Sequence, residues 1–390
     1  MGVQRGECMR NTNTNTHANT LRPADGADYR YTRLIGTGGI GSGMLFQLTD
    51  EHTLGRNESR LGVLTDSRDY CKLHIICHYP AVLLGRGGFA VYPIGKVGKD
   101  AEGFALLAQL EDTGMSIAHV EIAEAVRTLF SVCFQYPDLS GGNLTTANSA
   151  SGLVAALDIE RALQELPPGA GELVLAAPEV PIEARIALLA EGRARGSFTV
   201  ASVLAAEAET FGRLGGYRLT DLLAVNREEA RRIAGLDEAC ADGGVIAERC
   251  YNALKAEQPE IRLIMTDGAD GCYSYEAGRC IHTPSLRVEA VSTAGAGDAL
   301  LGGVISGLCC GLPFMKEQSL GPGAVFGETP LSSAVELGVL LAALSVTSPH
   351  SIHPDADARL LGSFANENGL ALNDAFRSML QIKEESEDGV

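Results

Sequence analysis

The stretch VSTAGAGDALLGGVISG, residues 291–307, decides the fold of this 390-residue chain. Gly295, Ala296 and Gly297 come just before an apolar run that predicts a helix. The first N–H groups of a helix have no partner within it, so they form a ready site for phosphate. The next residue is Asp298, whose carboxylate repels phosphate. Residues 295–298 therefore combine amide groups that attract phosphate with a carboxylate that repels it.

The composition excludes several classes of protein. The chain is 45% hydrophobic and 21% charged, so it can bury a core, and its formal net charge of −18 argues against non-specific nucleic-acid binding. The longest apolar runs, such as LGVLLAALSV, are too short to span a bilayer. The ten cysteines form no CxxC pair and no zinc-ligand spacing. We expect a cytoplasmic protein with reduced thiols and without a nucleic-acid or membrane partner.

Alternating strand and helix patterns fill the second half of the chain. Apolar strand-like runs at 173–177, 197–202, 221–226 and 261–266 are separated by segments with helical spacing. This alternation predicts a mostly parallel sheet covered by helices on both faces. Helical spacing also predicts helices at 99–115 and 331–348. The Gly- and Pro-containing segment 313–330 predicts a loop insertion.

The region from about 44 to 100 is harder to interpret. It consists of short runs such as MLFQL, KLHIICHY and GFAVYPIG, broken by Gly, Asn and Asp. We interpret these runs as strands, some central and some forming a β-hairpin flap.

Two more glycine-rich loops compete with 295–297 for a phosphate group. GTGGIG (36–41) is a literal GxGxxG, but MLFQLTD follows it and favours a strand over the helix that a dinucleotide site requires. A turn between two strands is the alternative. TDGADG (266–271) directly follows a strand and suits either a nucleotide loop or a hairpin turn.

Four motifs in order resemble those of the ribokinase-like (PfkB) carbohydrate kinases. VSTAGAGD is similar to the family's D-T-x-G-A-G-D, IGKVGKDAEG (94–103) to its G-x-V-G-x-D-x-x-G, NREE (226–229) to its N-x-x-E and TDGADG to its T-x-G-x-x-G. The resemblance spans about 31–362. It implies an α/β three-layer sandwich with a mostly parallel central sheet and a small β-hairpin lid.

The domain organisation follows from this resemblance. We expect a disordered tail at 1–28, where NTNTNTHANT has little to bury, and a kinase domain at 29–362 with lid strands within about 44–90. A C-terminal helix and the acidic tail KEESEDGV complete the chain at 363–390.

The resemblance also assigns roles. Asp298 would take the proton of the attacking hydroxyl, while the amides of Gly295, Ala296 and Gly297 hold the phosphoryl group. Glu229 would support Mg²⁺ through water. ATP would be bound by five further residues: Asn226, Thr266, Gly268, Gly271 and Thr293.

The chain departs from the family at two places. Ser292 replaces an Asp that helps to bind a monovalent cation in some members, so the resemblance does not imply such a cation here. The acceptor-binding G-G-x-x-x-N would fall near 74–79, which lacks it, and the Asp usual after the first strand would fall near 41–42. Candidates for acceptor contact are therefore Gly41, Ser42, His74, His78 and Tyr79; the alternative is that they are structural strand residues.

These observations predict an ATP-dependent kinase that transfers the γ-phosphoryl group to a hydroxyl of a small sugar or sugar-like acceptor. A non-catalytic nucleotide- or ligand-binding protein on the same fold and a Rossmann oxidoreductase remain as alternatives. ATP and a small-molecule acceptor are the expected partners, and pairing of two chains through the lid stays open.

Overall fold

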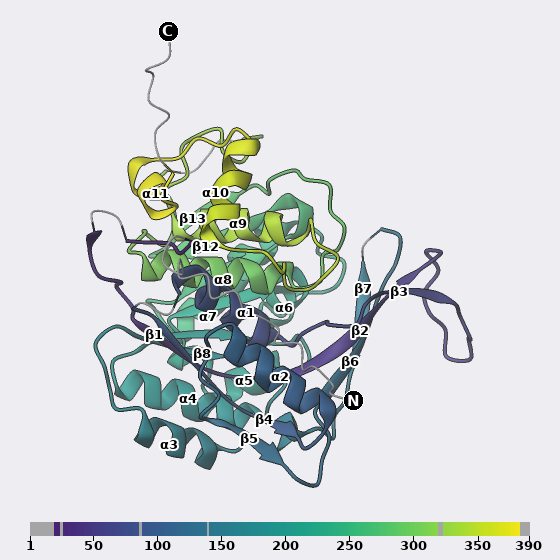
Figure 1. The fold of residues 1–390 in the computed structure, drawn as a ribbon. Coiled ribbons are helices and arrows are strands. Elements are labelled where there is room, and N and C mark those ends of the chain that lie inside the picture. The colour runs from purple at the N-terminus through teal and green to yellow at the C-terminus, as the bar shows by residue number, and fades with distance from the viewer. Residues whose placement is uncertain (1–18, 24–25, 86–87, 139, 319–322, 383–390) are drawn as a thin grey trace, which may run out of the picture.

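The computed structural model describes residues 19–23, 26–85, 88–138, 140–318 and 323–382. A nine-stranded sheet, in the order β13-β12-β11-β10-β9-β8-β1-β4-β5, forms the centre of the molecule (Figure 1). Every neighbouring pair from β11 to β5 is parallel, and β12 and β13 are antiparallel. The strands are β1 Arg33–Thr37, β4 Ala90–Gly98, β5 Val120–Ala123, β8 Glu172–Ala176, β9 Phe198–Ser202, β10 Leu222–Asn226, β11 Arg262–Thr266, β12 Cys272–Glu276 and β13 Arg279–Thr283.

Helices cover both faces of this sheet, as predicted. Most residues of the central strands are buried, and in β8 every residue is buried. Two separate apolar clusters lie on the two faces. One cluster includes residues of α1 Lys72–Leu84, α2 Ala101–Asp112, α8 Ala296–Cys309, α9 Ala334–Ser345, α10 Ala358–Glu367 and α11 Asp374–Met379. The other includes residues of α3 Ala156–Glu165, α4 Ile182–Ala194, α5 Ala208–Arg213, α6 Arg227–Ile233 and α7 Gly243–Glu257.

Close helix packing fixes the position of α8. A Cβ added to Gly303 would lie 2.8 Å from Cα of Gly338, and one added to Gly338 would lie 2.6 Å from the carbonyl oxygen of Leu300. Glycines at both positions let the backbones of α8 and α9 touch, and α1 packs against the other side of α8 at Gly302. The start of α8 is thereby held between two helices.

A second sheet of four strands stands to one side of the main body (Figure 1, right). Its order is β3-β2-β6-β7, from β2 Gly41–Leu48, β3 Gly62–Asp66, β6 Leu129–Gln135 and β7 Gly141–Thr145. Only β2 and β3 come from the region in which we expected the lid strands. The other half is supplied by residues 129–145, after α2.

The prediction of a strand at 72–79 is wrong, because these residues form the first two turns of α1. Ten of its thirteen residues are buried, and they lie all around the helix rather than on one stripe. A helix that is apolar on every side shows no 3.6-residue alternation, so its sequence is indistinguishable from a buried strand.

The GTGGIG loop is a turn between strands, as its sequence context indicated. β1 ends at Thr37, and β2 begins at Gly41. The dinucleotide fingerprint needs a helix at this point. The structure therefore excludes the Rossmann site at 36–41.

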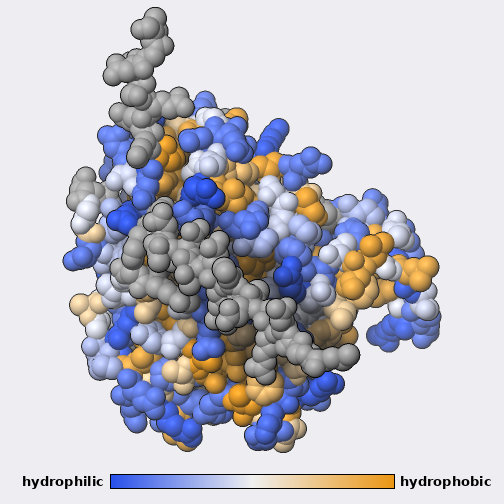
Figure 2. Space-filling view, in the orientation of Figure 1, coloured by the Kyte–Doolittle hydropathy of each residue, from blue (hydrophilic) through white to orange (hydrophobic). Residues whose placement is uncertain are grey.

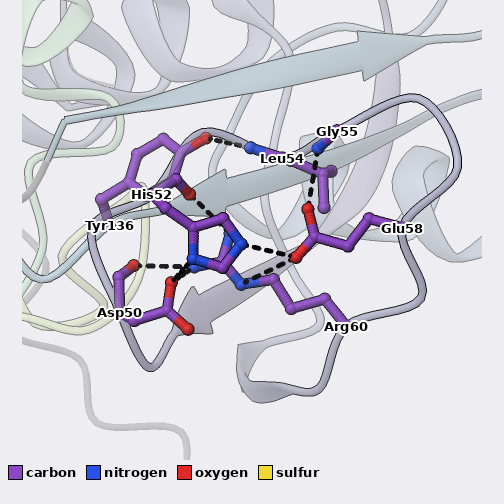
Figure 3. Close-up of polar contacts among 7 residues, drawn as sticks. All are labelled: Asp50, His52, Leu54, Gly55, Glu58, Arg60 and Tyr136. Carbon is purple, nitrogen blue, oxygen red and sulfur yellow. Dashed lines mark hydrogen bonds and ion pairs between the residues drawn. The ribbon is translucent and has the colours of Figure 1, made fainter.

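The connection from β2 to β3 is folded on itself by a network of charged side chains (Figure 3). His52 lies between two carboxylates, with Nδ1 2.6 Å from Oδ1 of Asp50 and Nε2 2.7 Å from Oε1 of Glu58. Arg60 also pairs with Asp50 and donates to the carbonyl of His52 at 2.7 Å. The His52 side chain is 60% exposed, so these contacts hold the loop's shape more than they stabilise the fold.

The remaining segments complete the description. The described residues of 313–330 form turns and irregular loop, as predicted. Most of the tail expected at 1–28 and the acidic end at 383–390 lie outside the described residues. The helices in the described part of the chain are all too short or too polar to cross a bilayer.

Candidate active site

The helix α8 begins at a left-handed glycine, the first of the residues predicted to bind phosphate. Gly295, the N-cap, has a φ of 77°, and a Cβ there would lie 2.4 Å from the carbonyl oxygen of Ser351. Only glycine fits this left-handed, crowded position. The N–H of Ala296 donates to the carbonyl of Thr293 at 3.3 Å, a long bond. The amides of the first helical turn lie at the positive end of the helix dipole, beside Asp298.

Asp298 is paired with a lysine that the sequence analysis did not single out. Nζ of Lys72, the first residue of α1, lies 3.3 Å from Oδ1 of Asp298. The two side chains are 28% and 14% exposed, respectively. Burial raises the pKa of Asp298, and the Lys72 ammonium opposes that rise. The pair therefore places a positive charge beside a carboxylate whose burial disfavours its charged form.

A cavity of about 690 Å³ opens beside this pair, between the small sheet and the main body. Its volume is in the range of small-molecule sites. Strands β6 and β7, the segment before α1 and the start of α8 all contribute. It is lined by Asp69, Tyr70, Cys71, Lys72, Ile75, Leu129, Ser131, Cys133, Asn143, Thr145, Thr146, Ala147, Ser149, Gly152, Glu179, Leu204, Ala294, Gly295 and Asp298.

Glu179 is a second functional candidate that sequence reasoning missed. It follows β8 with a φ of 75°, a left-handed conformation that is strained for a residue with a side chain. Its Oε2 is buried with no hydrogen-bond partner among the described residues, and a Cβ on Gly39 would come within 2.5 Å of it. Burial raises the pKa of Glu179 to about 7, against the opposing effect of Lys72. A strained backbone and a carboxylate oxygen without a hydrogen-bond partner at a cavity wall suit ligand binding, and no motif marks this position.

Asp69 provides a third carboxylate at the cavity wall. Its Oδ2 accepts a hydrogen bond from the thiol of Cys133 on β6 at 2.7 Å. Burial raises the pKa of Asp69, and the weak thiol donor only partly opposes this. Asp69 thus joins the segment before α1 to the small sheet.

The structure does not bring the predicted acceptor residues of β2 to the cavity. A Cβ on Gly41 would lie 2.5 Å from the carbonyl oxygen of Leu129, so Gly41 is glycine because β2 and β6 pair closely. The hydroxyl of Ser42 donates to Glu102 of α2. Neither residue lines the cavity, and Ser42 has a structural partner.

The three predicted residues of 74–79 belong to the buried helix α1 and do not line the cavity either. Burial lowers the pKa of His74 to about 3 and that of His78 to about 4, so both are neutral. The hydroxyl of Tyr79 accepts the N–H of His353 at 3.2 Å. Their expected contact with the acceptor has no support in this geometry, because the strand on which it relied is a helix.

Asn226 and Glu229 form a capping box at the start of α6. The side chain of Asn226 accepts the N–H of Glu229 at 2.9 Å, and Oε2 of Glu229 accepts the N–H of Asn226 at 2.7 Å. Glu229 is 5% exposed, and burial raises its pKa while Lys72 opposes the rise. The motif thus has a structural role and also places a carboxylate in the field of Lys72.

Two of the predicted nucleotide residues meet at the carboxyl ends of neighbouring strands. Asn226 and Thr266 are register partners at the ends of β10 and β11, and a Cβ on Gly297 would lie 3.9 Å from Oγ1 of Thr266. Ligands of open α/β sheets bind at such strand ends. Gly268 and Gly271 have φ values of 58° and 99° in the tight turn that follows.

The loop before α8 is tied to the small sheet. The Gln135 side chain of β6 donates to Oγ1 of Thr293 at 3.1 Å. The Ser292 hydroxyl accepts the N–H of Ala294 at 3.3 Å, so Ser292 shapes this loop.

Comparison with known proteins places this arrangement in a known group. The family model described as pfkB family carbohydrate kinase matches residues 80–358. A curated relative, the bifunctional protein HldE of Geotalea uraniireducens (strain Rf4), is 29% identical over 150 residues, which is 37% of this chain and 29% of the relative. The chain therefore spans less than a third of that relative's length.

Solved structures share the fold at low sequence identity. Ribokinase from Giardia lamblia superposes with a TM-score of 0.65 and 17% identity, covering 81% of this chain and 93% of its own. Ribokinase from Cryptococcus neoformans var. grubii serotype A in complex with ADP gives a TM-score of 0.62 and 18% identity. The match covers 86% of this chain and 99% of that ribokinase. These similarities show that the two-sheet architecture is that of ribokinase-like proteins.

Proposed function

The chain belongs to the PfkB family of carbohydrate kinases, and on that premise we propose that it transfers the γ-phosphoryl group of ATP to a hydroxyl of a small sugar or sugar-like acceptor. The observation that carries this proposal is Asp298. Its carboxylate stands at the wall of a ligand-sized cavity and directly beside the amides at the start of α8.

This placement divides the work between neighbouring groups. Asp298 accepts the proton of the acceptor hydroxyl while the oxygen attacks the γ-phosphorus, the β–γ P–O bond breaks and ADP leaves. The amides of Gly295–Gly297 and the dipole of α8 stabilise the charge on the transferred group. The acid faces the nucleophile and the amides face the phosphate, which resolves the conflict within residues 295–298.

Mg²⁺ would neutralise the phosphates of ATP in this reaction. Within the described ranges, no group of three or more His, Cys, Asp or Glu side chains could hold a metal ion directly. In nucleotide-dependent enzymes Mg²⁺ commonly keeps several waters and binds chiefly the phosphates of the nucleotide. Glu229, with one oxygen committed to the capping box, would then act on the ion through water.

Glu229→Gln should raise the Mg²⁺ concentration needed for half-maximal rate by about 10-fold or more. Glutamine can still accept the N–H of Asn226, so the capping box and the thermal stability should be retained. The rate is measured across a Mg²⁺ titration. Glu228→Gln, a neighbouring change at a 44% exposed side chain, is the matched control. An unchanged Mg²⁺ curve with a raised acceptor KM would place Glu229 in the acceptor site instead.

An acceptor screen tests the proposed activity itself. ADP release is measured with a panel of sugars, nucleosides and polyols, and ATP binding is measured by calorimetry. We expect normal ATP binding and poor turnover of ribose, because the family's acceptor motif is replaced by the buried helix α1. Ribose turnover as efficient as that of an ordinary ribokinase would contradict an altered acceptor site. ATP binding without ADP release for any acceptor would favour the non-catalytic alternative.

We further infer that two chains pair through the small sheet. Figure 2 shows apolar side chains on this sheet, and its edge strands carry Leu144 on β7 and Val63 and Leu64 on β3, which are 74%, 59% and 49% exposed. Exposed apolar side chains on unpaired edge strands favour association.

Light scattering after gel filtration should give twice the chain mass of 41.0 kDa. Leu144→Lys with Val63→Lys should give a monomer, and Leu157→Lys, a 54% exposed leucine on α3, should not. A wild-type monomer at all protein concentrations would exclude this pairing.

A further inference from the structure

Lys72 occupies a position that is unfavourable for a cation by itself. It is the first residue of α1, whose N-cap Cys71 makes no side-chain cap and whose first turn has no acidic residue. The N-terminus of a helix is its positive end, so an ammonium group there is repelled by the dipole. Something outside α1 must compensate for this charge.

The compensation comes from carboxylates on three other segments. Asp298 of α8 is nearest, at 3.3 Å, and Glu229 of α6 and Glu179 after β8 also raise the pKa of Lys72. The negative charge of Asp298 also raises the pKa of Asp69, which lies three residues before Lys72. Lys72 is therefore protonated throughout the physiological pH range.

The carboxylates depend on Lys72 in return. Of the described residues that line the cavity, Lys72 is the one with a cationic side chain, whereas Asp69, Glu179 and Asp298 are all acidic. Burial raises the pKa of each of these carboxyl groups. The phenol of Tyr79, which is buried and neutral, offers Asp298 no positive charge.

We propose that Lys72 is the positioning residue of the proposed base: its ammonium group keeps the Asp298 carboxylate ionised and holds it at the cavity wall, ready for the acceptor hydroxyl. This inference rests on the proposed kinase function. The pairing explains why a lysine stands at the start of α1 against the helix dipole. It also explains how a base can work in a partly buried acidic cavity without becoming protonated.

The direct test is the pKa of Asp298, which needs no activity. Aspartate labelled with ¹³C at the carboxyl carbon is incorporated, the Asp298 resonance is identified by its loss in Asp298→Asn, and it is titrated by NMR. In Lys72→Met the pKa of Asp298 should rise by about 1–3 units, the usual effect of one close opposite charge. Lys72→Arg should restore it to within about one unit of wild type. An unmoved resonance in Lys72→Met would overturn the proposal.

The kinetic test uses the acid limb of the kcat profile. In Lys72→Met this limb should move to higher pH by the same amount, with the rate recovering as pH rises, and Lys72→Arg should reverse the shift. Lys99→Met, which breaks an exposed pair with Glu124, is the matched control. A uniform loss of kcat with an unmoved limb would mean that Lys72 contacts the phosphoryl group and not the base.

Two further controls keep the outcomes distinct. Burial raises the pKa of Glu179 to about 7, so the profile is repeated in Glu179→Gln to remove its contribution. Lys72→Gln replaces Lys72→Met if the latter does not fold, as judged by circular dichroism. If the wild type has no kinase activity, the proposed function fails, whereas the NMR titration still decides the role of Lys72.

Discussion

Asp298→Asn should lower kcat by a factor of about 10² to 10⁴, the range expected when a general base is lost. The amide has nearly the shape of the carboxylate but cannot take the acceptor's proton. ATP binding should persist, because the amides of 295–297 and the strand ends at 226 and 266 are unchanged. Single-turnover rates and calorimetric ATP affinity measure the two effects separately.

The stability of the same variant should depend less on pH than that of the wild type. Burial raises the pKa of Asp298 in the folded protein, so the fold favours the protonated carboxyl. The contribution of this group to stability is therefore greatest at low pH and is lost as pH rises through its folded-state pKa. An uncharged amide does not titrate, so this pH dependence should disappear in the variant. The exposed Asp355→Asn serves as the control for both measurements. Near-normal turnover of Asp298→Asn would remove Asp298 from the reaction.

Gly295→Ala should lower both stability and rate. The φ of 77° and the carbonyl oxygen of Ser351, 2.4 Å from the added Cβ, leave no place for a methyl group. We expect a stability loss of about 1–3 kcal/mol from the strained backbone. Because the first amides of α8 would be displaced, kcat should fall by about 10² to 10³, as when an oxyanion donor is removed.

Gly297→Ala, two residues on, is the matched control for folding. Its added Cβ would lie 3.9 Å from its nearest neighbour, Oγ1 of Thr266, which is an ordinary van der Waals contact. Alanine also has a higher helix propensity than glycine. Urea unfolding should show Gly297→Ala as stable as the wild type or more so, and Gly295→Ala as clearly weaker. Equal stability of the two variants would show that the left-handed position at 295 carries no strain.

The parts of the site that sequence could predict are those fixed by one short segment. Gly295 to Asp298 share the start of one helix, and Asn226 with Glu229 form a capping box across three residues, so their spacing alone implies proximity. The strands at 173–177, 197–202, 221–226 and 261–266 were likewise predictable, because each is a short, largely apolar run. The roles of these residues in catalysis stay predictions.

The parts that sequence could not predict depend on contacts between distant segments. Lys72 is the first residue of a helix that is apolar on all sides. The sequence of such a helix resembles that of a buried strand, so the pattern predicts a strand there. Glu179 follows β8 without a motif, and its left-handed backbone is not visible in sequence. Half of the small sheet comes from 129–145, so the cavity wall could not be assembled from residues 44–90 alone.

The packing of α1 against α8 has a consequence during synthesis. Lys72 and Asp298 are 226 residues apart, so at bacterial or eukaryotic translation rates α1 leaves the ribosome about 10–45 s before its partner helix. Throughout that interval the α8-facing side of α1, around Ile76 and Tyr79, has no cover from the chain made so far. A nascent chain arrested before residue 296 should therefore recruit chaperones that bind apolar segments, and one extended past α9 should release them.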